Sequence, residues 1–236
     1  MTQAPLAYVL LSGGIDSSTC VSEAINTVGR TRARCISIDY GQRHIRELKS
    51  AEAVAKFYGR PHAVLPIHIP NSMLTNPDIP VPEIPYSQIT GVSPTYVPFR
   101  NGLMLSTLTS HIVGLHYDPT KDGDSDYDPE NVFLYFGAHA EDAAGWAYPD
   151  CSPEFIGAMA NAIYVGTYHK VRLVTPFAFM MKSQIIDRGS DLGTPYHLTF
   201  SCYKGGEDHC GVCSTCISRR EAFKKAGVPD PTTYLA

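Results

Sequence analysis

The sequence predicts an α/β fold built on a doubly wound, mostly parallel sheet, from two observations. Short apolar runs alternate with segments of helical periodicity along most of the chain. This order is typical of parallel strands joined by right-handed crossovers. The composition, with 44% hydrophobic and 18% charged residues among 236, is that of an ordinary globular protein. It points neither to disorder nor to membrane spans.

Five segments have the length and apolar character of buried strands. Strands covered on both faces of a parallel sheet show continuous apolar runs rather than alternation. The predicted strands are residues 7–11, 35–39, 63–67, 132–136 and 171–177.

Helices are predicted where apolar residues recur at intervals of three and four. Asp16 and Ser17 are placed to cap the first helix, and Gly29 and Gly59 to end the first two. The predicted helices are residues 17–28, 45–58, 101–116, 153–165, 183–189 and 217–226.

Three segments lack such periodicity. Residues 66–98 contain eight prolines and are predicted to form an ordered excursion or a lid. Residues 118–130 are acidic and turn-rich, and they lack the ligand spacing of a calcium loop. The chain is therefore divided into a nucleotide-binding α/β domain over 1–198 and a C-terminal metal-binding segment over 199–236, packed on the same domain.

The sharpest motif is Ser-Gly-Gly-Ile-Asp-Ser, residues 12–17, between the first predicted strand and helix. Gly13 and Gly14 allow the backbone to approach an anion, and the helix N-terminus offers N–H groups to it. A carboxylate beside phosphates is repulsive unless a divalent cation bridges them, so Asp16 indicates Mg²⁺. The motif resembles that of the ATP pyrophosphatase, or PP-loop, family, which cleaves ATP between its α- and β-phosphates.

Four cysteines, Cys202, Cys210, Cys213 and Cys216, cluster near the C-terminus. Four thiolates can close a tetrahedral shell around Zn²⁺, which leaves no position for water and predicts a structural role. An iron–sulfur cluster is the alternative, since closely spaced cysteines also bind clusters.

Further polar residues follow predicted strands or begin predicted helices. The carboxyl ends of parallel strands meet at one edge of a sheet, so these side chains are expected in one cleft. Lys182 would stabilise phosphate charge, and an aromatic ring with a carboxylate suits a flat heterocycle. The candidate substrate contacts are Arg100, Asn101, Asp142, Tyr148 and Asp150.

SGGIDSS, DYGQRH, YVPFRN, YPDCSPEF and SCYKGGEDHCGVCSTCISRREAF resemble the 7-cyano-7-deazaguanine synthase family of the queuosine and archaeosine pathways. The resemblance runs from about Ala7 to Tyr234. It implies a ligase that converts 7-carboxy-7-deazaguanine and ammonia into the nitrile. An acyl adenylate and an amide would be the intermediates, and ATP would be consumed with Mg²⁺.

The resemblance also assigns residues. Ser12, Asp16, Ser17 and Lys182 would be catalytic, the four cysteines would bind Zn²⁺, and the family typically forms a homodimer. The expected ATP-binding residues are Leu11, Ser12, Gly13, Gly14, Ile15, Asp16, Ser17, Ser18, Thr19, Cys20 and Val21.

The net charge and the motifs bear on the partners, the location and the alternative functions of the protein. A net charge of -4 offers no basic surface for a nucleic acid, so no such partner is expected. No signal peptide or membrane span is evident, which predicts a cytoplasmic protein. A PP-loop enzyme that modifies tRNA, a deazaguanine enzyme that stops at the amide, and a zinc-knuckle nucleic-acid-binding module remain as alternatives.

Overall fold

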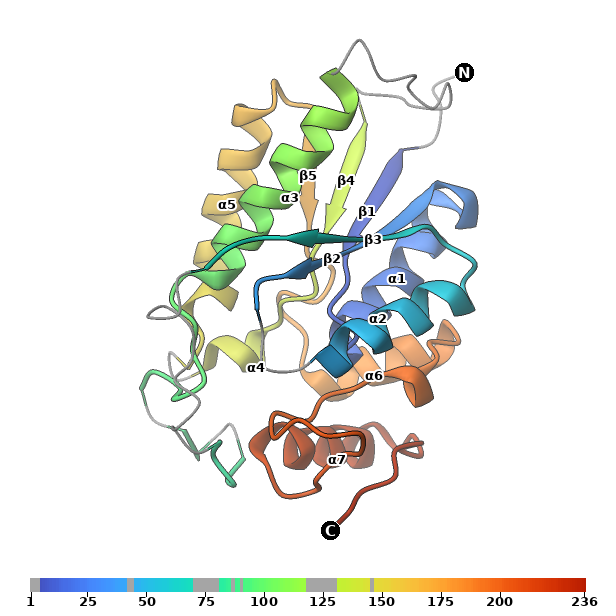
Figure 1. Cartoon of the computed structure of the whole chain (residues 1–236), viewed down its shortest axis with the longest axis vertical. Coiled ribbons are helices and arrows are strands. Elements are labelled where there is room, and N and C mark those ends of the chain that lie inside the picture. The colour runs from blue at the N-terminus through green and yellow to red at the C-terminus, as the bar shows by residue number, and fades with distance from the viewer. Residues whose placement is uncertain are drawn as a thin grey trace.

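The computed structural model describes residues 5–41, 45–69, 81–85, 88–89, 91–117, 131–144 and 147–236. Within them a five-stranded parallel sheet has the order β3-β2-β1-β4-β5, with helices on both faces (Figure 1). The predicted doubly wound α/β fold is therefore confirmed. The strands are β1 (Leu6–Leu10), β2 (Ala33–Asp39), β3 (His62–Pro66), β4 (Val132–Tyr135) and β5 (Val171–Val174).

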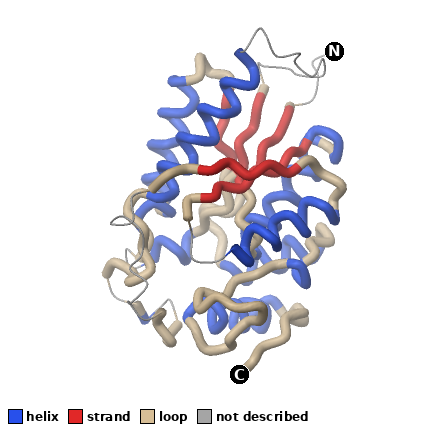
Figure 2. The backbone as a smooth tube through the Cα atoms, in the orientation of Figure 1, coloured by secondary structure: helices blue, strands red, loops and turns tan. Residues whose placement is uncertain are grey.

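The strands are connected by helices, as Figure 2 shows in colour. Short 3₁₀ turns lie at Arg30–Arg32, Pro149–Cys151 and Tyr196–Leu198. The helices are α1 (Ile15–Val28), α2 (Ile45–Phe57), α3 (Arg100–Tyr117), α4 (Ala140–Ala143), α5 (Pro153–Gly166), α6 (Lys182–Asp191) and α7 (Ser214–Ala226).

Strand β1 lies at the centre of the sheet, and its register places Val9 beside Cys35 of β2 and Tyr135 of β4. The chain winds from β1 through β2 to β3, then returns to the other side of β1 to form β4 and β5. The connection that leaves β1 therefore runs toward β2, and the connection that leaves β4 runs the opposite way, toward β5. In parallel sheets a ligand cleft opens at this point, outside the carboxyl ends of the strands.

Alternate residues of the central strand face two separate hydrophobic cores. Tyr8 and Leu10 pack with Leu105 of α3 on one face, where α5 also lies. Val9 packs with Ala24 of α1 on the other face, which α2 and α6 also cover. Both faces of β1 are therefore buried, as its continuous apolar run predicted, whereas most of the edge strand β3 is exposed.

Most predicted boundaries agree with the structure to within two residues, and two details were wrong. The fifth strand ends at Val174 rather than at residue 177, because Pro176 has no N–H to donate to a neighbouring strand. Asp16 and Ser17 do not cap the first helix. It begins at Ile15, after Gly14, without a side-chain cap, so both residues lie in its first turn.

The C-terminal segment packs on the α/β domain through α6 and α7 (Figure 1). Phe223 of α7 lies against Ile186 of α6 and against Tyr196, whose ring is 5.3 Å away centroid to centroid. The subdivision of the chain after residue 198 stays a prediction. Within the described ranges, none of the helices combines the length and apolar character needed to cross a bilayer.

Arg219 of α7 is 1% exposed and connects three parts of this segment. Its guanidinium donates to Thr199 Oγ1 at 2.8 Å and to the Tyr196 carbonyl at 3.1 Å. It also forms an ion pair with Asp230 at 3.3 Å. Burial by itself raises the pKa of Asp230, but hydrogen bonds from Tyr234 and Thr232, together with Arg219, lower it overall. Asp230 is therefore the charged partner of a buried cation.

Replacing Asp230 with asparagine is expected to lower the free energy of unfolding by about 3–5 kcal/mol, because it leaves a buried guanidinium without its counter-charge. Urea denaturation of the variant measures this loss. Glu221→Gln removes an exposed carboxylate from α7, the helix that carries Arg219, and serves as the control. Equal stabilities of the two variants would contradict the prediction.

Several features of the sequence lie outside the described residues. They are residues 42–44 of the DYGQRH motif, Trp146 beside Tyr148, the acidic stretch 118–130, and residues 70–80, 86–87 and 90 of the proline-rich stretch. The described part of that stretch reaches the C-terminal segment, where Ser214 N donates to the Pro82 carbonyl at 2.8 Å.

Candidate functional site

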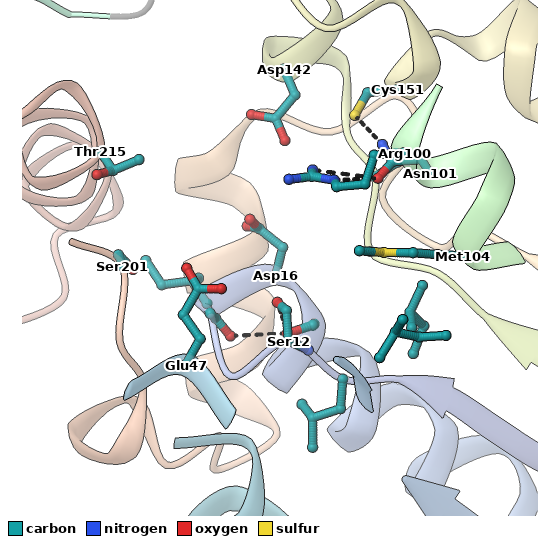
Figure 3. A pocket seen from close by; sticks show the side chains of 18 of the residues that line it. Ser12, Asp16, Glu47, Arg100, Asn101, Met104, Asp142, Cys151, Ser201 and Thr215 are labelled. Atoms are coloured by element: carbon teal, nitrogen blue, oxygen red, sulfur yellow. Dashed lines mark hydrogen bonds between the residues drawn. The ribbon is translucent and has the colours of Figure 1, made fainter. Parts of the chain in front are cut away.

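A cavity of about 650 Å³ lies at the carboxyl ends of β1, β2 and β4, where the sheet topology predicts a ligand cleft (Figure 3). Residues from both halves of the sheet and from the C-terminal segment line it. Polar and charged side chains gather around its centre, and Phe136, Phe200 and Met104 supply apolar surface. The space and its mixture of polar and apolar walls suit a small-molecule ligand.

The loop after β1 forms one wall of the cavity. Ser12 N donates to Ser17 Oγ at 3.2 Å, and the hydroxyl oxygens of Ser12 and Ser17 are 3.0 Å apart. These bonds hold the loop against the first turn of α1, whose N-terminus has no side-chain cap. An anion in the cavity would therefore meet two hydroxyls and the positive end of a helix dipole.

Gly13 has a backbone conformation that other residues rarely adopt, with φ of +87°. A Cβ atom at this position would lie 2.4 Å from the Glu47 carbonyl oxygen and 2.8 Å from the Ala51 amide nitrogen. Both atoms belong to the backbone of α2, so neither can move aside alone. The glycine lets the loop and α2 pack in direct contact.

Gly13→Ala is expected to cost well over 1 kcal/mol of folding stability, since backbone strain and a backbone clash add together. Gly29→Ala is the matched control. Gly29 has the same φ of +87° but open space where the Cβ would lie. Thermal denaturation should therefore show a larger loss for the Gly13 variant. A loss no larger than that of Gly29→Ala would mean that the loop can move away from α2.

Four ionisable side chains form a network beside the loop. Lys182 Nζ is 3.3 Å from Asp16 Oδ2, and His139 Nε2 is 3.6 Å from the same oxygen. His139 Nε2 is also 3.3 Å from Asp142 Oδ2. Asp16 follows β1, His139 and Asp142 follow β4, and Lys182 begins α6. The network therefore connects three separate segments of the chain at Asp16.

The charges of this network stabilise one another. Burial favours the neutral form of each group, but Lys182 and His139 lower the pKa of Asp16 overall. Asp16 and Asp142 raise the pKa of Lys182 in spite of its burial. Burial lowers the pKa of His139 as well, yet Asp142 and Asp16 raise it overall. Asp16 is therefore ionised and Lys182 charged at neutral pH.

Asp16, His139 and Asp142 could also hold a metal ion, because their ligand atoms lie within 4.8 Å of one another. Asp16 Oδ1 and both ring nitrogens of His139 make no hydrogen bond within the described residues. Carboxylate oxygens are the ligands that Mg²⁺ takes in proteins, usually together with substrate phosphates. The residues present thus fit a divalent cation next to the loop.

Arg100 lies on the opposite wall, at the first turn of α3 (Figure 3). Burial would lower its pKa, but Tyr40, Tyr203 and Cys151 raise it overall, so the guanidinium keeps its charge. Asn101 fixes the start of the helix, since its backbone N–H donates to Asp150 Oδ2 at 2.9 Å. A permanent cation thus faces the phosphate loop across the cavity.

The cysteine cluster lies where the C-terminal segment enters α7. The Sγ atoms of Cys202, Cys210, Cys213 and Cys216 all lie within 4.8 Å of one another, so the cluster could hold a metal ion. Cys210 Sγ and Cys216 Sγ are 3.9 Å apart. Tetrahedral zinc with bonds of about 2.3 Å separates its sulfur ligands by about 3.8 Å. The cluster has the dimensions of such a site.

Residues 6–227 match the family model described as queuosine biosynthesis protein QueC. This chain belongs to the QueC family. It is 40% identical to the 7-cyano-7-deazaguanine synthase of Thermoplasma volcanium, over 97% of this chain and 90% of that protein. The proteins of the same name from Caldicellulosiruptor bescii and Acetivibrio thermocellus are 39% and 38% identical, and this chain covers 96% and 97% of them. The family resemblance predicted from the motifs is confirmed, and the chain is an enzyme.

The similarity to a solved structure is much weaker than the similarity to these sequence relatives. The U34-tRNA thiolase NcsA from Methanococcus maripaludis superposes with a TM-score of 0.46 at 17% identity, over 96% of this chain and 68% of that one. This value is too low to bear on function.

The cavity of this QueC family member collects some of the predicted site residues. Its lining includes Leu11, Ser12, Gly14, Ile15, Asp16, Ser17, Arg100, Asn101, Asp142 and Lys182. Ser18, Thr19, Cys20 and Val21 are buried below the loop in α1 and do not line it, nor does Gly13. Thr19 Oγ1 instead donates to the Ile15 carbonyl at 2.9 Å. These residues support the loop from behind.

Tyr148 and Asp150 also lie outside the lining. Tyr148 OH is 2.6 Å from Thr95 Oγ1, which ties the end of the proline-rich stretch to the domain. Asp150 is 4% exposed and holds the first turn of α3 through Asn101. Both therefore support residues of the cavity, and a direct contact of either with a ligand stays a prediction.

Other lining residues were not singled out from the sequence. Glu47 is the most important, because it brings a carboxylate into the cavity. The sequence feature that could have indicated Glu47 is its position in the first turn of a helix that follows the end of a strand. Ser201, Tyr203 and Thr215 come from the cysteine segment, whose metal-ligand spacing drew attention away from its other polar residues.

Proposed function

We propose that this protein is an ATP-dependent ligase that converts 7-carboxy-7-deazaguanine and ammonia into 7-cyano-7-deazaguanine. The observation that supports this most directly is the shared cavity of the phosphate loop, Lys182 and Arg100. It can accommodate the phosphates of ATP and an anionic planar acid side by side. The relatives named 7-cyano-7-deazaguanine synthase support the choice of acid.

The reaction begins with attack of the substrate carboxylate on the α-phosphorus of ATP, which releases pyrophosphate and forms an acyl adenylate. Ammonia then displaces AMP and leaves the amide. A second ATP activates the amide oxygen, and loss of AMP and of the N–H protons leaves the nitrile. The protein chiefly aligns the reactants and excludes water from the adenylate.

Each wall of the cavity has a role in this scheme. The loop residues Ser12 and Ser17, with the backbone amides around them, bind the phosphates of ATP. Lys182 stabilises the charge that develops on the departing pyrophosphate. Arg100 and Asn101 orient the acid, and Asp142 accepts hydrogen bonds from the heterocycle.

Metal ions complete the proposal. Asp16 would hold Mg²⁺, which would neutralise the charge of the phosphates. Zn²⁺ would occupy the four-cysteine cluster, where a closed thiolate shell gives it a structural role. We also propose a cytoplasmic homodimer that binds no nucleic acid.

The other candidate is a PP-loop enzyme that adenylates a different substrate, such as a deazaguanine enzyme that stops at the amide. The elements shared by both are the phosphate loop and the cation at Lys182. They differ in the product, so the product separates them.

The experiment supplies purified protein with 7-carboxy-7-deazaguanine, ammonium and Mg-ATP and identifies products by mass spectrometry. The nitrile, with two AMP for each molecule formed, is the expected result. A Ser12→Ala, Asp16→Ala double variant should form neither product. Amide without nitrile would favour the diverged enzyme. No ATP cleavage with this acid would overturn the proposal.

A further inference from the structure

Glu47 is a carboxylate of the cavity to which the scheme above gives no role. It lies in the first turn of α2, and Figure 3 shows its side chain directed into the cavity, on the side of Ser12 and Asp16. The other two carboxylates of the lining belong to the charge network with Lys182 and His139. Glu47 is not part of that network.

The backbone holds Glu47 next to the phosphate loop. Its carbonyl oxygen lies so close to Gly13 that a Cβ there would approach to 2.4 Å. The first turn of α2 therefore packs directly against the loop. Glu47 lines the same cavity as Ser12 and Gly14, so a group bound at the loop has its carboxylate nearby.

The surroundings of this carboxylate favour proton uptake. Within the described part of the chain it forms neither a hydrogen bond nor an ion pair, while Asp16 has Lys182 at 3.3 Å. Burial raises the pKa of Glu47 to about 7, and Arg100 opposes the shift without cancelling it. A base whose pKa lies near the working pH transfers protons most effectively.

The proposed chemistry needs such a base. Ammonia attacks the carbonyl carbon of the acyl adenylate through its lone pair, and the new nitrogen substituent carries a positive charge and an excess proton. The proton must leave as the bond to the AMP oxygen breaks and its electron pair departs with AMP. A carboxylate beside the nitrogen can accept this proton, so the departing AMP does not have to.

We propose that Glu47 is the general base that removes this proton from the attacking ammonia. The carboxylate becomes a carboxylic acid, the tetrahedral species collapses to amide and AMP, and the acid then releases its proton to solvent. The same carboxylate can accept in turn the two N–H protons that leave when the activated amide becomes a nitrile, if it passes the first to solvent before it takes the second. The inference rests on the proposed function, because it assigns a step of that reaction.

Formation of the amide should therefore depend on pH through Glu47. Its ionised form is active, so at a constant concentration of free NH₃ the rate should rise as pH increases through about 7 and then level off. The other charged or titratable groups that line the cavity are Arg100, Asp16, Lys182, Asp142, Cys151, Tyr40 and Tyr203. Arg46, the residue before Glu47 on α2, instead lies 4.0 Å from Glu207.

The test separates the two half-reactions in Glu47→Gln, which keeps the shape of the side chain. Exchange of labelled pyrophosphate into ATP, dependent on 7-carboxy-7-deazaguanine, reports adenylation alone. Single-turnover formation of amide after ammonium is added reports the second step. Glu52→Gln removes an exposed carboxylate from the same helix and is the control.

We expect Glu47→Gln to retain pyrophosphate exchange within about threefold, and to form amide about 10²–10⁴-fold more slowly. It should also lose the rise in rate near pH 7 that wild type and Glu52→Gln display. Unchanged amide formation, or an equal loss in both half-reactions, would overturn the role of Glu47. No acid-dependent exchange in the wild type would instead overturn the proposed function, and the Glu47 assignment with it.

Discussion

Lys182→Met is expected to lower the rate of acid-dependent adenylation by about 10²–10³-fold, the loss typical of removing one charged or hydrogen-bonding group that stabilises a transition state. The side chain is 15% exposed and its Nζ lies 3.3 Å from Asp16 Oδ2. A fixed cation in this position needs no rearrangement when charge develops on pyrophosphate. The effect should appear in kcat more than in the KM for ATP.

The measurement is the initial rate of pyrophosphate release with saturating acid and Mg-ATP. Lys56→Met removes an exposed lysine from α2 and should be as active as wild type. Lys182→Arg should recover part of the rate, since it restores the charge with altered geometry. Thermal denaturation checks that the variant is folded, because the change leaves Asp16 without its nearest cation. A raised KM with unchanged kcat would mean that Lys182 only binds ATP.

Cys213→Ser is expected to lower the zinc content from one ion per chain to near zero and to unfold the C-terminal segment. In small zinc peptides the metal supplies about 10–16 kcal/mol of folding free energy. The segment around the cluster has a small core of its own, formed by Phe200 and the cysteines. The stability of the segment should therefore depend on the metal, and Cys213→Ser is expected to lower its free energy of unfolding by several kcal/mol.

Elemental analysis and hydrogen exchange test this prediction. Amides of residues 199–236 should exchange faster in Cys213→Ser, and those of β1 should change much less. Cys20→Ala is the matched control, since Cys20 is buried in the α1 core and lies outside the cluster. Iron in place of zinc, with absorbance in the visible range, would contradict the zinc assignment and favour an iron–sulfur cluster.

Loss of the segment should also impair the active site. Phe200, Ser201, Tyr203 and Thr215 line the cavity, and Phe200 N donates to the Gly13 carbonyl at 2.9 Å. The cysteine cluster and the phosphate loop are thus linked through one short stretch of backbone. This link gives the cysteine segment a direct part in shaping the ligand site.

Local sequence patterns determined most of the fold. Strands buried on both faces must be continuously apolar, and helices that cover them must repeat at 3.6 residues, so the elements were visible one by one. The order of the elements then allowed few topologies. The phosphate loop and the cysteine cluster were equally visible, because each is formed by residues close together in the chain.

Only the tertiary structure decided which polar residues share the cavity. Tyr148 and Asp150 support Thr95 and the start of α3, and their predicted contact with the substrate stays a prediction. Glu47 and His139 lie beside the phosphate loop because segments far apart in sequence pack together there. The physical reason is that a short motif specifies its own backbone, whereas the direction of a lone side chain depends on what packs against its helix.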